Sequence, residues 1–285
     1  MIAANPIPYW AKTGKSREAF AEAFRDYQAI GFTAVKADVP DDMTAAEYRE
    51  WIASFGLAPA LSLFNSPFDE TVDAAAEVEK AKRFAAVQAE LGLDRTMVSS
   101  MSRPERMAQP AVGAGFDEGR LARAIDMCGQ VCVALRAEGL WPLHHSHVGG
   151  IFETETECHR LLDDLGPAVI GAGPDTGHLT WAGVDPVGYL ERYADRVGAL
   201  HIKDCFADFL DPAARAGLSY AEVTDTKRLW AEPGLGVVDF DAVLAALPAS
   251  YSGGFMIEVD VPSVATKRES HQISYDWARR HLAAG

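Results

Sequence analysis

The stretch Pro167-Ala168-Val169-Ile170-Gly171-Ala172-Gly173-Pro174-Asp175-Thr176-Gly177-His178 decides the fold, because it joins a short apolar run directly to polar side chains. Residues 167–172 predict a buried strand, and Asp175 and His178 follow its end. The same pattern recurs in three other segments. Residues 140–147 end in His-His-Ser-His, residues 197–204 in His-Ile-Lys-Asp, and residues 254–260 in Glu-Val-Asp.

Four more apolar runs precede these, at residues 2–7, 32–38, 57–64 and 96–99. Between the runs, apolar residues recur at spacings of three and four, which predicts helices. Thr154 and Glu157 form a T-x-x-E capping box at the start of one of them. Eight strand–helix units without a linker predict an α/β fold, a (β/α)8 TIM barrel that forms a single domain over residues 1–285.

A doubly wound open sheet is the alternative fold. Its dinucleotide-binding form would show a G-x-G-x-x-G turn after the first strand, and this sequence has none there. An open sheet would also gather its polar residues at one switch point, whereas here they follow many strands. The barrel is therefore the preferred prediction.

Composition excludes several classes of function. The net charge is −15, and the longest basic run is Lys267-Arg268, so we expect no nucleic-acid partner. No apolar stretch is long enough to span a membrane, and the N-terminus lacks the pattern of a signal peptide. We expect a cytoplasmic protein without a membrane partner, whose four cysteines are free thiols.

The polar strand ends predict a metal site. The C-terminal ends of all strands in a barrel face one mouth, so residues far apart in sequence meet there. Five of the eight histidines lie in the four segments quoted above, together with Asp175 and Glu258. Such a set of nitrogen and oxygen donors suits Mn²⁺, Co²⁺, Mg²⁺ or Zn²⁺.

Each of these residues also has a purely structural interpretation. A single histidine near a strand end is usually a hydrogen-bonded core residue. Asp175 could simply cap the following turn, and Lys203 and Asp204 could form a solvated ion pair. Glu258 is harder to explain in this way, because an unpaired carboxylate within an apolar strand would cost several kcal/mol. Taken together, the residues favour a metal site.

Other candidates carry a weaker signal. Lys36 interrupts the second apolar run and would point at the mouth if its register matches, or would be a surface lysine. Trp10, just beyond the first run, could stack on a sugar or plug the mouth. Residues 232–236, Glu-Pro-Gly-Leu-Gly, predict a rigid loop with two permissive glycines. The long connection 206–229 could form a lid, an interface or two surface helices.

These motifs resemble the xylose-isomerase-like barrel superfamily of sugar isomerases, epimerases and type-IV endonucleases, across roughly residues 144–260. Within it, His145-Ser146-His147-Val148-Gly149 and Glu258-Val259-Asp260 are similar to the H-x-H-x-G and E-x-D of inosose dehydratases. The resemblance implies that Asp175, His201 and Glu258 are metal ligands and that His178, Lys203 and Asp260 contact substrate. Residues Trp10 and Lys36 are added as candidate substrate contacts.

The segment after the fifth strand departs from the epimerase pattern. Epimerases of this superfamily carry a glutamate there, and this chain has His145. The loss of that carboxylate makes two-carboxylate epimerisation less favoured. It also leaves the fourth ligand open between His145, which we prefer, and His147, since both point the same way from a strand.

The resemblance therefore implies a divalent-metal-dependent lyase, a dehydratase that acts on a keto-inositol or keto-sugar through an enediolate. Mn²⁺ or Co²⁺ is the expected metal, and a homodimer or homotetramer the expected assembly. Glu258 or a strand-five histidine would be the base, and His178 or His147 the acid, with Lys203 also in the catalytic set. The alternatives are a sugar isomerase or epimerase, and a lyase that cleaves 3-keto-glycosides by β-elimination.

Overall fold

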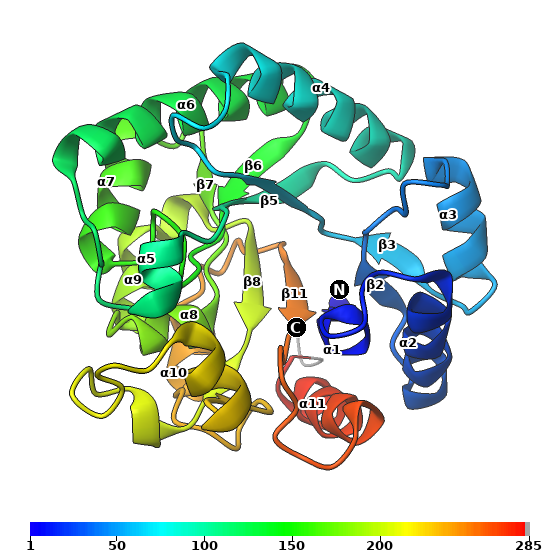
Figure 1. Cartoon of the computed structure of the whole chain (residues 1–285). Helices are drawn as coiled ribbons and strands as arrows, with labels where there is room; N and C mark the ends of the chain where they lie inside the picture. Colours follow the sequence, from blue (N-terminus) through cyan, green and yellow to red (C-terminus); the bar gives the residue numbers. More distant parts are fainter. Residues whose placement is uncertain (283–285) are drawn as a thin grey trace.

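Parallel strands and helices alternate along the chain, as the computed structural model shows for residues 1–282 (Figure 1). The predicted domain extends to residue 285, and residues 283–285 lie outside the described residues. One sheet has the order β3-β2-β1-β11-β8, with bounds Ala58–Ala60, Ala34–Lys36, Ile2–Ala4, Gly254–Ile257 and Ala199–Ile202. The other has the order β4-β5-β6-β7, with bounds Leu63–Ser66, Arg95–Ser100, Trp141–His144 and Gly171–Ala172.

The two sheets are the two halves of one barrel. Strands β3 and β4 are consecutive pieces of one extended run, and a parallel bridge between Ala172 and Val197 joins β7 to the segment before β8. Counting β3 and β4 as one strand gives the eight parallel strands that the sequence predicts. The short antiparallel pair of β9 (Asp204–Cys205) and β10 (Trp230–Ala231) is an addition to them.

Helices surround the strands, and Figure 1 shows α3, α4, α6 and α7 as an outer layer. The longer helices are α2 (Arg17–Ile30), α3 (Ala45–Ala53), α4 (Ala74–Glu90), α6 (Glu118–Ala137), α7 (Glu155–Leu165), α9 (Pro186–Arg192) and α11 (Lys267–His281). The short ones are α1 (Ile7–Trp10), α5 (Pro104–Ala108), α8 (Thr176–Trp181) and α10 (Phe240–Ala245). The predicted capping box of Thr154 and Glu157 opens α7.

Two apolar layers hold the barrel together. Apolar side chains fill its interior, among them the small Ala3, Ala34 and Ala60 and the longer Met256. The alternate strand residues, such as Val35 and Ile257, pack outward against the helices. This alternation places polar residues at the strand ends in one inward-facing layer above the small apolar ones.

Two predicted elements differ in the structure. The first strand, predicted over residues 2–7, ends at Ala4. Residues 7–10 form the short helix α1. The connection 206–229 contains no pair of surface helices. It holds a 3-10 turn, η2 (Ala207–Phe209), and a π-helical turn, η3 (Glu222–Thr226). Its two ends are tied together where β9 pairs with β10.

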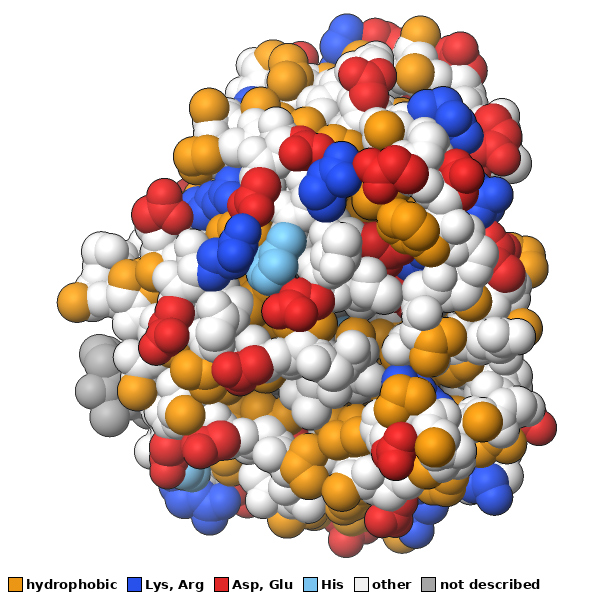
Figure 2. All heavy atoms as spheres, turned by 90° about the vertical axis from the view of Figure 1, so that its left-hand side faces the viewer, with side chains coloured by type: hydrophobic (Ala, Val, Ile, Leu, Met, Phe, Trp, Pro, Cys, Tyr) orange, Lys and Arg blue, Asp and Glu red, His pale blue; other side chains and the backbone are white. Residues whose placement is uncertain are grey.

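The cysteines, the helices and the surface charges agree with what the composition predicts. All four cysteines are free and buried, as predicted. Among the described residues, no helix is both long and apolar enough to cross a membrane. On the face drawn in Figure 2, Lys and Arg side chains are scattered singly among acidic ones, without a continuous basic area.

Candidate metal centre and substrate cavity

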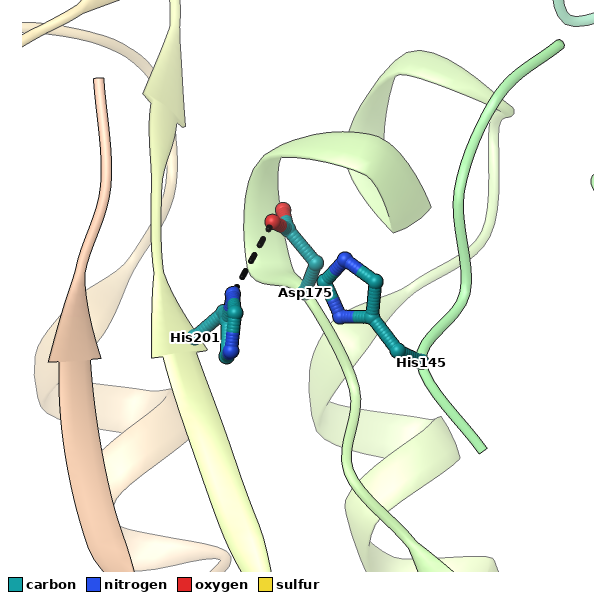
Figure 3. A group of neighbouring side chains, drawn as sticks. All are labelled: His145, Asp175 and His201. Atoms are coloured by element: carbon teal, nitrogen blue, oxygen red, sulfur yellow. Dashed lines mark ion pairs between the residues drawn. The ribbon is translucent and has the colours of Figure 1, made fainter. Parts of the chain in front are cut away.

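Three predicted metal ligands meet at the mouth of the barrel (Figure 3). His145 follows β6, Asp175 precedes α8, and His201 lies in β8. Each offers one ligand atom, and these atoms lie within 4.8 Å of one another. All three side chains are buried. His201 Nδ1 lies 3.9 Å from Asp175 Oδ2, the pair marked by the dashed line in the figure.

Glu258, directly after β11, borders this cluster. Its Oε2 accepts hydrogen bonds from His201 Nδ1 (2.9 Å) and from Asn5 Nδ2 (2.5 Å), and its Oε1 accepts one from Lys203 Nζ (2.8 Å). Burial alone would raise the pKa of Glu258, but Lys203 and His201 outweigh it and hold that pKa well below its usual value. Glu258 is therefore a firmly held carboxylate.

Asp175 combines the two interpretations that its sequence allows. Its Oδ1 accepts the His178 N–H at 2.9 Å and so caps α8. Its Oδ2 is buried and has no hydrogen-bond partner, and the same holds for Nδ1 of His145. Buried polar atoms are normally paired, so two unpaired atoms in one cluster indicate room for a ligand between them.

The charges of the site point to the same kind of ligand. Asp175, Glu258 and Asp260 are three carboxylates close to one cation, Lys203. Burial lowers the pKa of His145 and of the neighbouring His178 well below its usual value, which favours neutral rings. When all three carboxylates are ionised, two negative charges stay unbalanced, and a divalent cation would balance them. The donor set thus fits a divalent metal ion.

Lys203 lies at the centre of the acidic groups. Its Nζ is 2.8 Å from Glu258 Oε1, 2.9 Å from Asp260 Oδ2 and 3.6 Å from Asp175 Oδ2. Burial alone would lower the pKa of Lys203, but these carboxylates raise it well above its usual value. The ammonium also lies 4.6 Å from the ring centroid of Trp230. A solvated pair with Asp204 is therefore wrong, because both side chains are buried and Lys203 pairs elsewhere.

A second group lies beside the first and consists of His147, His178 and Asp260. The rings of His147 and His178 lie close together, with their centroids 3.7 Å apart and their planes inclined by 35°. Burial lowers the pKa of His147 to about 4. His178 Nε2 is 4.0 Å from Asp260 Oδ2 and 3.2 Å from Lys203 Nζ. His145 belongs to the first group and His147 to the second, which separates the two histidines that the sequence could not distinguish.

A cavity of about 590 Å³ opens above this second group, a volume within the range of small-molecule sites. His147 and Asp260 supply polar groups to its wall, and Trp10, Tyr220 and Trp230 supply aromatic surface. Trp10 thus lies where a sugar contact was predicted. The connection 206–229 reaches the cavity through Tyr220, Thr224 and Asp225.

Lys36 takes a different position. It ends β2, two residues after Ala34, whose side chain lies in the barrel interior. Strand alternation therefore directs Lys36 inward, as its predicted role requires. However, Lys36 is not among the residues that line the cavity.

Three residues of the site were absent from the sequence prediction. Asn5 directly follows β1, so the rule that strand ends carry function could have found it. Trp230 lies in the short added strand β10, and Tyr220 lies in the irregular connection. Neither follows a predicted barrel strand, and no pattern in the sequence marks them.

Comparison with known proteins agrees with this architecture. The family described as xylose isomerase-like TIM barrel matches residues 24–281. An inosose dehydratase of Geobacillus kaustophilus is 33% identical over 147 residues, which cover 51% of this chain and 45% of that relative. An inosose dehydratase of Bacillus anthracis is 33% identical over 124 residues, covering 43% of this chain and 41% of the relative. The chain thus matches less than half the length of these curated relatives.

Solved structures resemble the chain over nearly its whole length. The IolI protein, solved with a bound zinc atom, has a TM-score of 0.71 at 14% identity and covers 99% of this chain and 98% of its own. An L-ribulose 3-epimerase has a TM-score of 0.71 at 15% identity, covering 99% and 94%. A probable 3-DHS dehydratase, AsbF, of Bacillus anthracis has a TM-score of 0.70 at 11% identity, covering 98% of both chains. At such identities the likeness concerns the fold.

Proposed function

This chain belongs to the xylose isomerase-like TIM barrel family, and we propose that it is a divalent-metal-dependent lyase that removes water from a keto-inositol or a related keto-sugar. The observation that carries the proposal is the close pair of His147 and His178 beside a cluster of metal-competent residues, with His147 at the wall of a polar and aromatic cavity. The partial similarity to inosose dehydratases supports the choice of substrate class.

His145, Asp175, His201 and Glu258 would hold the metal. Two imidazoles and two carboxylates suit Mn²⁺ or Co²⁺, and also Zn²⁺ or Mg²⁺. The zinc atom of the IolI structure shows that a related barrel binds a divalent ion. When bound, the metal would act as a Lewis acid that stabilises negative charge on the substrate's carbonyl oxygen. Asn5 and Lys203 would hold Glu258 in place for this task, through the contacts described above.

The reaction would begin with removal of the proton α to the carbonyl, which gives an enediolate, and would continue with loss of the hydroxyl one carbon further on. A general base works best when its pKa is near the working pH. The depressed pKa of Glu258 and its three hydrogen bonds therefore fit a ligand better than a base. Proton transfer would then fall to His147, which lies beside His178.

Substrate hydroxyls would contact His178, Lys203 and Asp260. The ammonium of Lys203 lies beside the groups that would surround the substrate and would also oppose negative charge that develops during the reaction. Trp10 would offer an apolar face to the ring of the substrate, and Lys36 would approach from β2. A homodimer or homotetramer is part of the proposal.

The same site would suit an epimerase or isomerase less well. Epimerisation with two acid–base groups needs them on opposite faces of the substrate, whereas the rings of His147 and His178 lie next to each other, with centroids 3.7 Å apart. Cleavage of a 3-keto-glycoside uses the same β-elimination with a larger leaving group. The two alternatives can be separated from dehydration by the mass of the product.

The test is turnover of 2-keto-myo-inositol by the chelated protein with Mn²⁺, Co²⁺ or Mg²⁺ added back. The proposal predicts metal-dependent loss of one water from the product mass and a rise in ultraviolet absorbance. Conversion without a mass change would overturn it in favour of an isomerase or epimerase. Glu258→Gln should abolish both metal binding and turnover, whereas the exposed control Glu70→Gln should retain both.

A further inference from the structure

The ring of His147 is held in one tautomer by a main-chain carbonyl. Its Nδ1 lies 2.7 Å from the carbonyl oxygen of Val148. A carbonyl oxygen can only accept a hydrogen bond, so Nδ1 must carry the proton. A neutral imidazole has a single N–H, and the other nitrogen, Nε2, therefore keeps its lone pair. His147 is also one of the residues that line the cavity.

The ring of His178 is held the opposite way by the same residue. The main-chain N–H of Val148 donates to His178 Nδ1 at 3.3 Å. A main-chain N–H can only donate, so Nδ1 of His178 is unprotonated and the proton of the neutral ring is on Nε2. The two neighbouring histidines thus have complementary hydrogen-bonding nitrogens.

Lys203 would favour the opposite tautomer of His178. Its Nζ lies 3.2 Å from Nε2 and would donate a hydrogen bond to that nitrogen if it were unprotonated. Three carboxylates already surround this ammonium, those of Glu258, Asp260 and Asp175. The buried N–H of Val148, by contrast, has only His178 Nδ1 as its partner. An unpaired buried N–H is costly, so the main-chain hydrogen bond decides the tautomer.

The peptide groups of Val148 are fixed by a network behind them. Glu153 accepts the N–H of Gly149 at 2.8 Å, directly after Val148. It also accepts the N–H of Gly113 at 2.8 Å, from the loop after α5. Arg106 binds both carboxylate oxygens of Glu157, which caps the helix that follows. The turn at Val148 and Gly149, which orients both imidazoles, is therefore held by the Glu153 carboxylate, and the start of the following helix is held by the Arg106–Glu157 pair.

We propose that Val148 divides the proton chemistry between the two rings, with His147 presenting an acceptor nitrogen to the substrate and His178 keeping its proton on Nε2, which lies on the side of Asp260. The assignment of chemical roles rests on the proposed dehydratase function, whereas the tautomers do not. His147 is then the base, and His178 is a positioning residue that keeps its proton on Nε2, 4.0 Å from Asp260 Oδ2. A neutral His178 cannot release its only proton without becoming an imidazolate anion, so it is not the source of the proton that leaves with water.

The elimination balances with His147 alone as the proton carrier. Its Nε2 takes the proton α to the carbonyl, and the electron pair of that C–H bond forms the double bond of the enediolate. When the enediolate collapses, the bond from the β-carbon to its hydroxyl oxygen breaks. The proton on His147 Nε2 leaves with this oxygen as water, and His147 returns to its neutral form. Hydrogen and hydroxyl therefore depart from the same face of the substrate.

Nuclear magnetic resonance of histidine tautomers tests the structural part without any substrate. Long-range ¹H–¹⁵N correlation of ¹⁵N-histidine-labelled protein, with and without diamagnetic Zn²⁺, reports which nitrogen of each ring is protonated. The expected spectrum shows His147 protonated at Nδ1 and His178 at Nε2. The same tautomer for both rings, or His178 protonated at Nδ1, would overturn the proposal even if the protein is a dehydratase.

A pair of glutamine variants tests the roles. The side-chain amide of His178→Gln can still donate near the position of Nε2, so kcat should fall, but less than in His147→Gln. The amide of His147→Gln cannot take up a proton, and kcat should fall about 10²- to 10⁴-fold with little change in KM. Equal losses in the two variants, or a greater loss in His178→Gln, would contradict the assignment. If the wild-type protein dehydrates no keto-inositol, the proposed function fails, and the tautomer spectrum still decides the rest.

Discussion

Asp175 caps a helix and at the same time offers a carboxylate oxygen to the proposed metal site at the mouth of the barrel. One oxygen caps α8 through the His178 N–H, and the other accepts no hydrogen bond and lies beside His145 and His201. The sequence suggested these two roles as alternatives, but the structure accommodates both. Since the cap fixes the carboxylate, the unpaired oxygen keeps a defined position before any ligand binds.

Asn5 should tune metal affinity through Glu258. Its amide donates to Glu258 Oε2 at 2.5 Å, so Asn5→Ala would leave that oxygen free to reorient. Loss of such an outer contact typically weakens metal binding about 10- to 100-fold. Isothermal titration with Mn²⁺ would measure the change. Asn65→Ala, at an exposed position of β4, should leave the affinity unaltered, and a similar loss in both variants would exclude a specific role for Asn5.

The sequence predicts those site residues that lie at the ends of barrel strands. His145, Asp175, His201 and Glu258 follow or end strands, so one topological rule brings them together. Tyr220 contacts the cavity from an irregular connection, whose path depends on long-range packing that the sequence pattern does not encode. The distinction between His145 and His147 depends on a bend of the chain after β6.

At the scale of elements, Asp204 organises the loop 232–236. Its carboxylate accepts the N–H groups of Gly234 (3.0 Å), Gly236 (2.9 Å) and Val238 (3.0 Å). The two positions require glycine for different reasons. Gly234 has a φ of +85°, whereas a Cβ at Gly236 would approach Asp204 Oδ1 to 2.3 Å. Next to Lys203 in sequence, Asp204 thus links this loop to the site.

Gly236→Ala should destabilise the protein by about 1–3 kcal/mol, because the new methyl group overlaps both Asp204 and the main chain of Cys205. Urea unfolding followed by circular dichroism gives the free energy of unfolding. The neighbouring variant Leu235→Ala, at an exposed side chain, should change it by less than about 0.5 kcal/mol. Equal stability of both variants would show that the loop adapts freely.

The strands of the barrel could be predicted, because their burial produces apolar runs in the sequence. Each of the eight apolar runs contains a barrel strand, because a strand buried on both faces needs continuous apolar sequence. The ends were less accurate, as in the first run, where the strand stops at Ala4. The connection 206–229 resisted prediction, since its turns are held by contacts such as Arg215 with the carbonyl oxygens of Pro110 and Ala111.

For the whole molecule, burial of histidines couples stability to pH. His271 in α11 is buried against Tyr27 and the main chain of Asn5. Burial is the main cause that lowers its pKa in the folded protein, despite the carbonyl groups that oppose it. As pH falls below about 6.5, the unfolded chain binds a proton at this histidine that the folded chain does not. Stability that is present above this pH is therefore lost as pH falls.

His271→Gln should lower, by up to one, the number of protons that the chain takes up when it unfolds at acidic pH. The free energy of unfolding of the variant should therefore depend less on pH. Between pH 6.5 and pH 5, the free energy of unfolding of the wild type should lose as much as about 1.4 kcal/mol per pH unit more than that of the variant. Urea titrations at several pH values measure the slope, whatever the variant does to stability itself. His281→Gln, at a ring that solvent reaches, is the control, and parallel slopes for wild type and His271→Gln would refute the account.

The central claim is that His145, Asp175, His201 and Glu258 hold one divalent metal ion. Calorimetric titration of the chelated protein with Mn²⁺ tests it most directly. We predict one equivalent per chain, because Lys203 already places a positive charge beside His178 and Asp260. Asp175→Asn, which can keep the cap of α8, should lose this binding, and the exposed Asp241→Asn should retain it. Absence of binding, two equivalents, or unchanged binding in Asp175→Asn would contradict the claim.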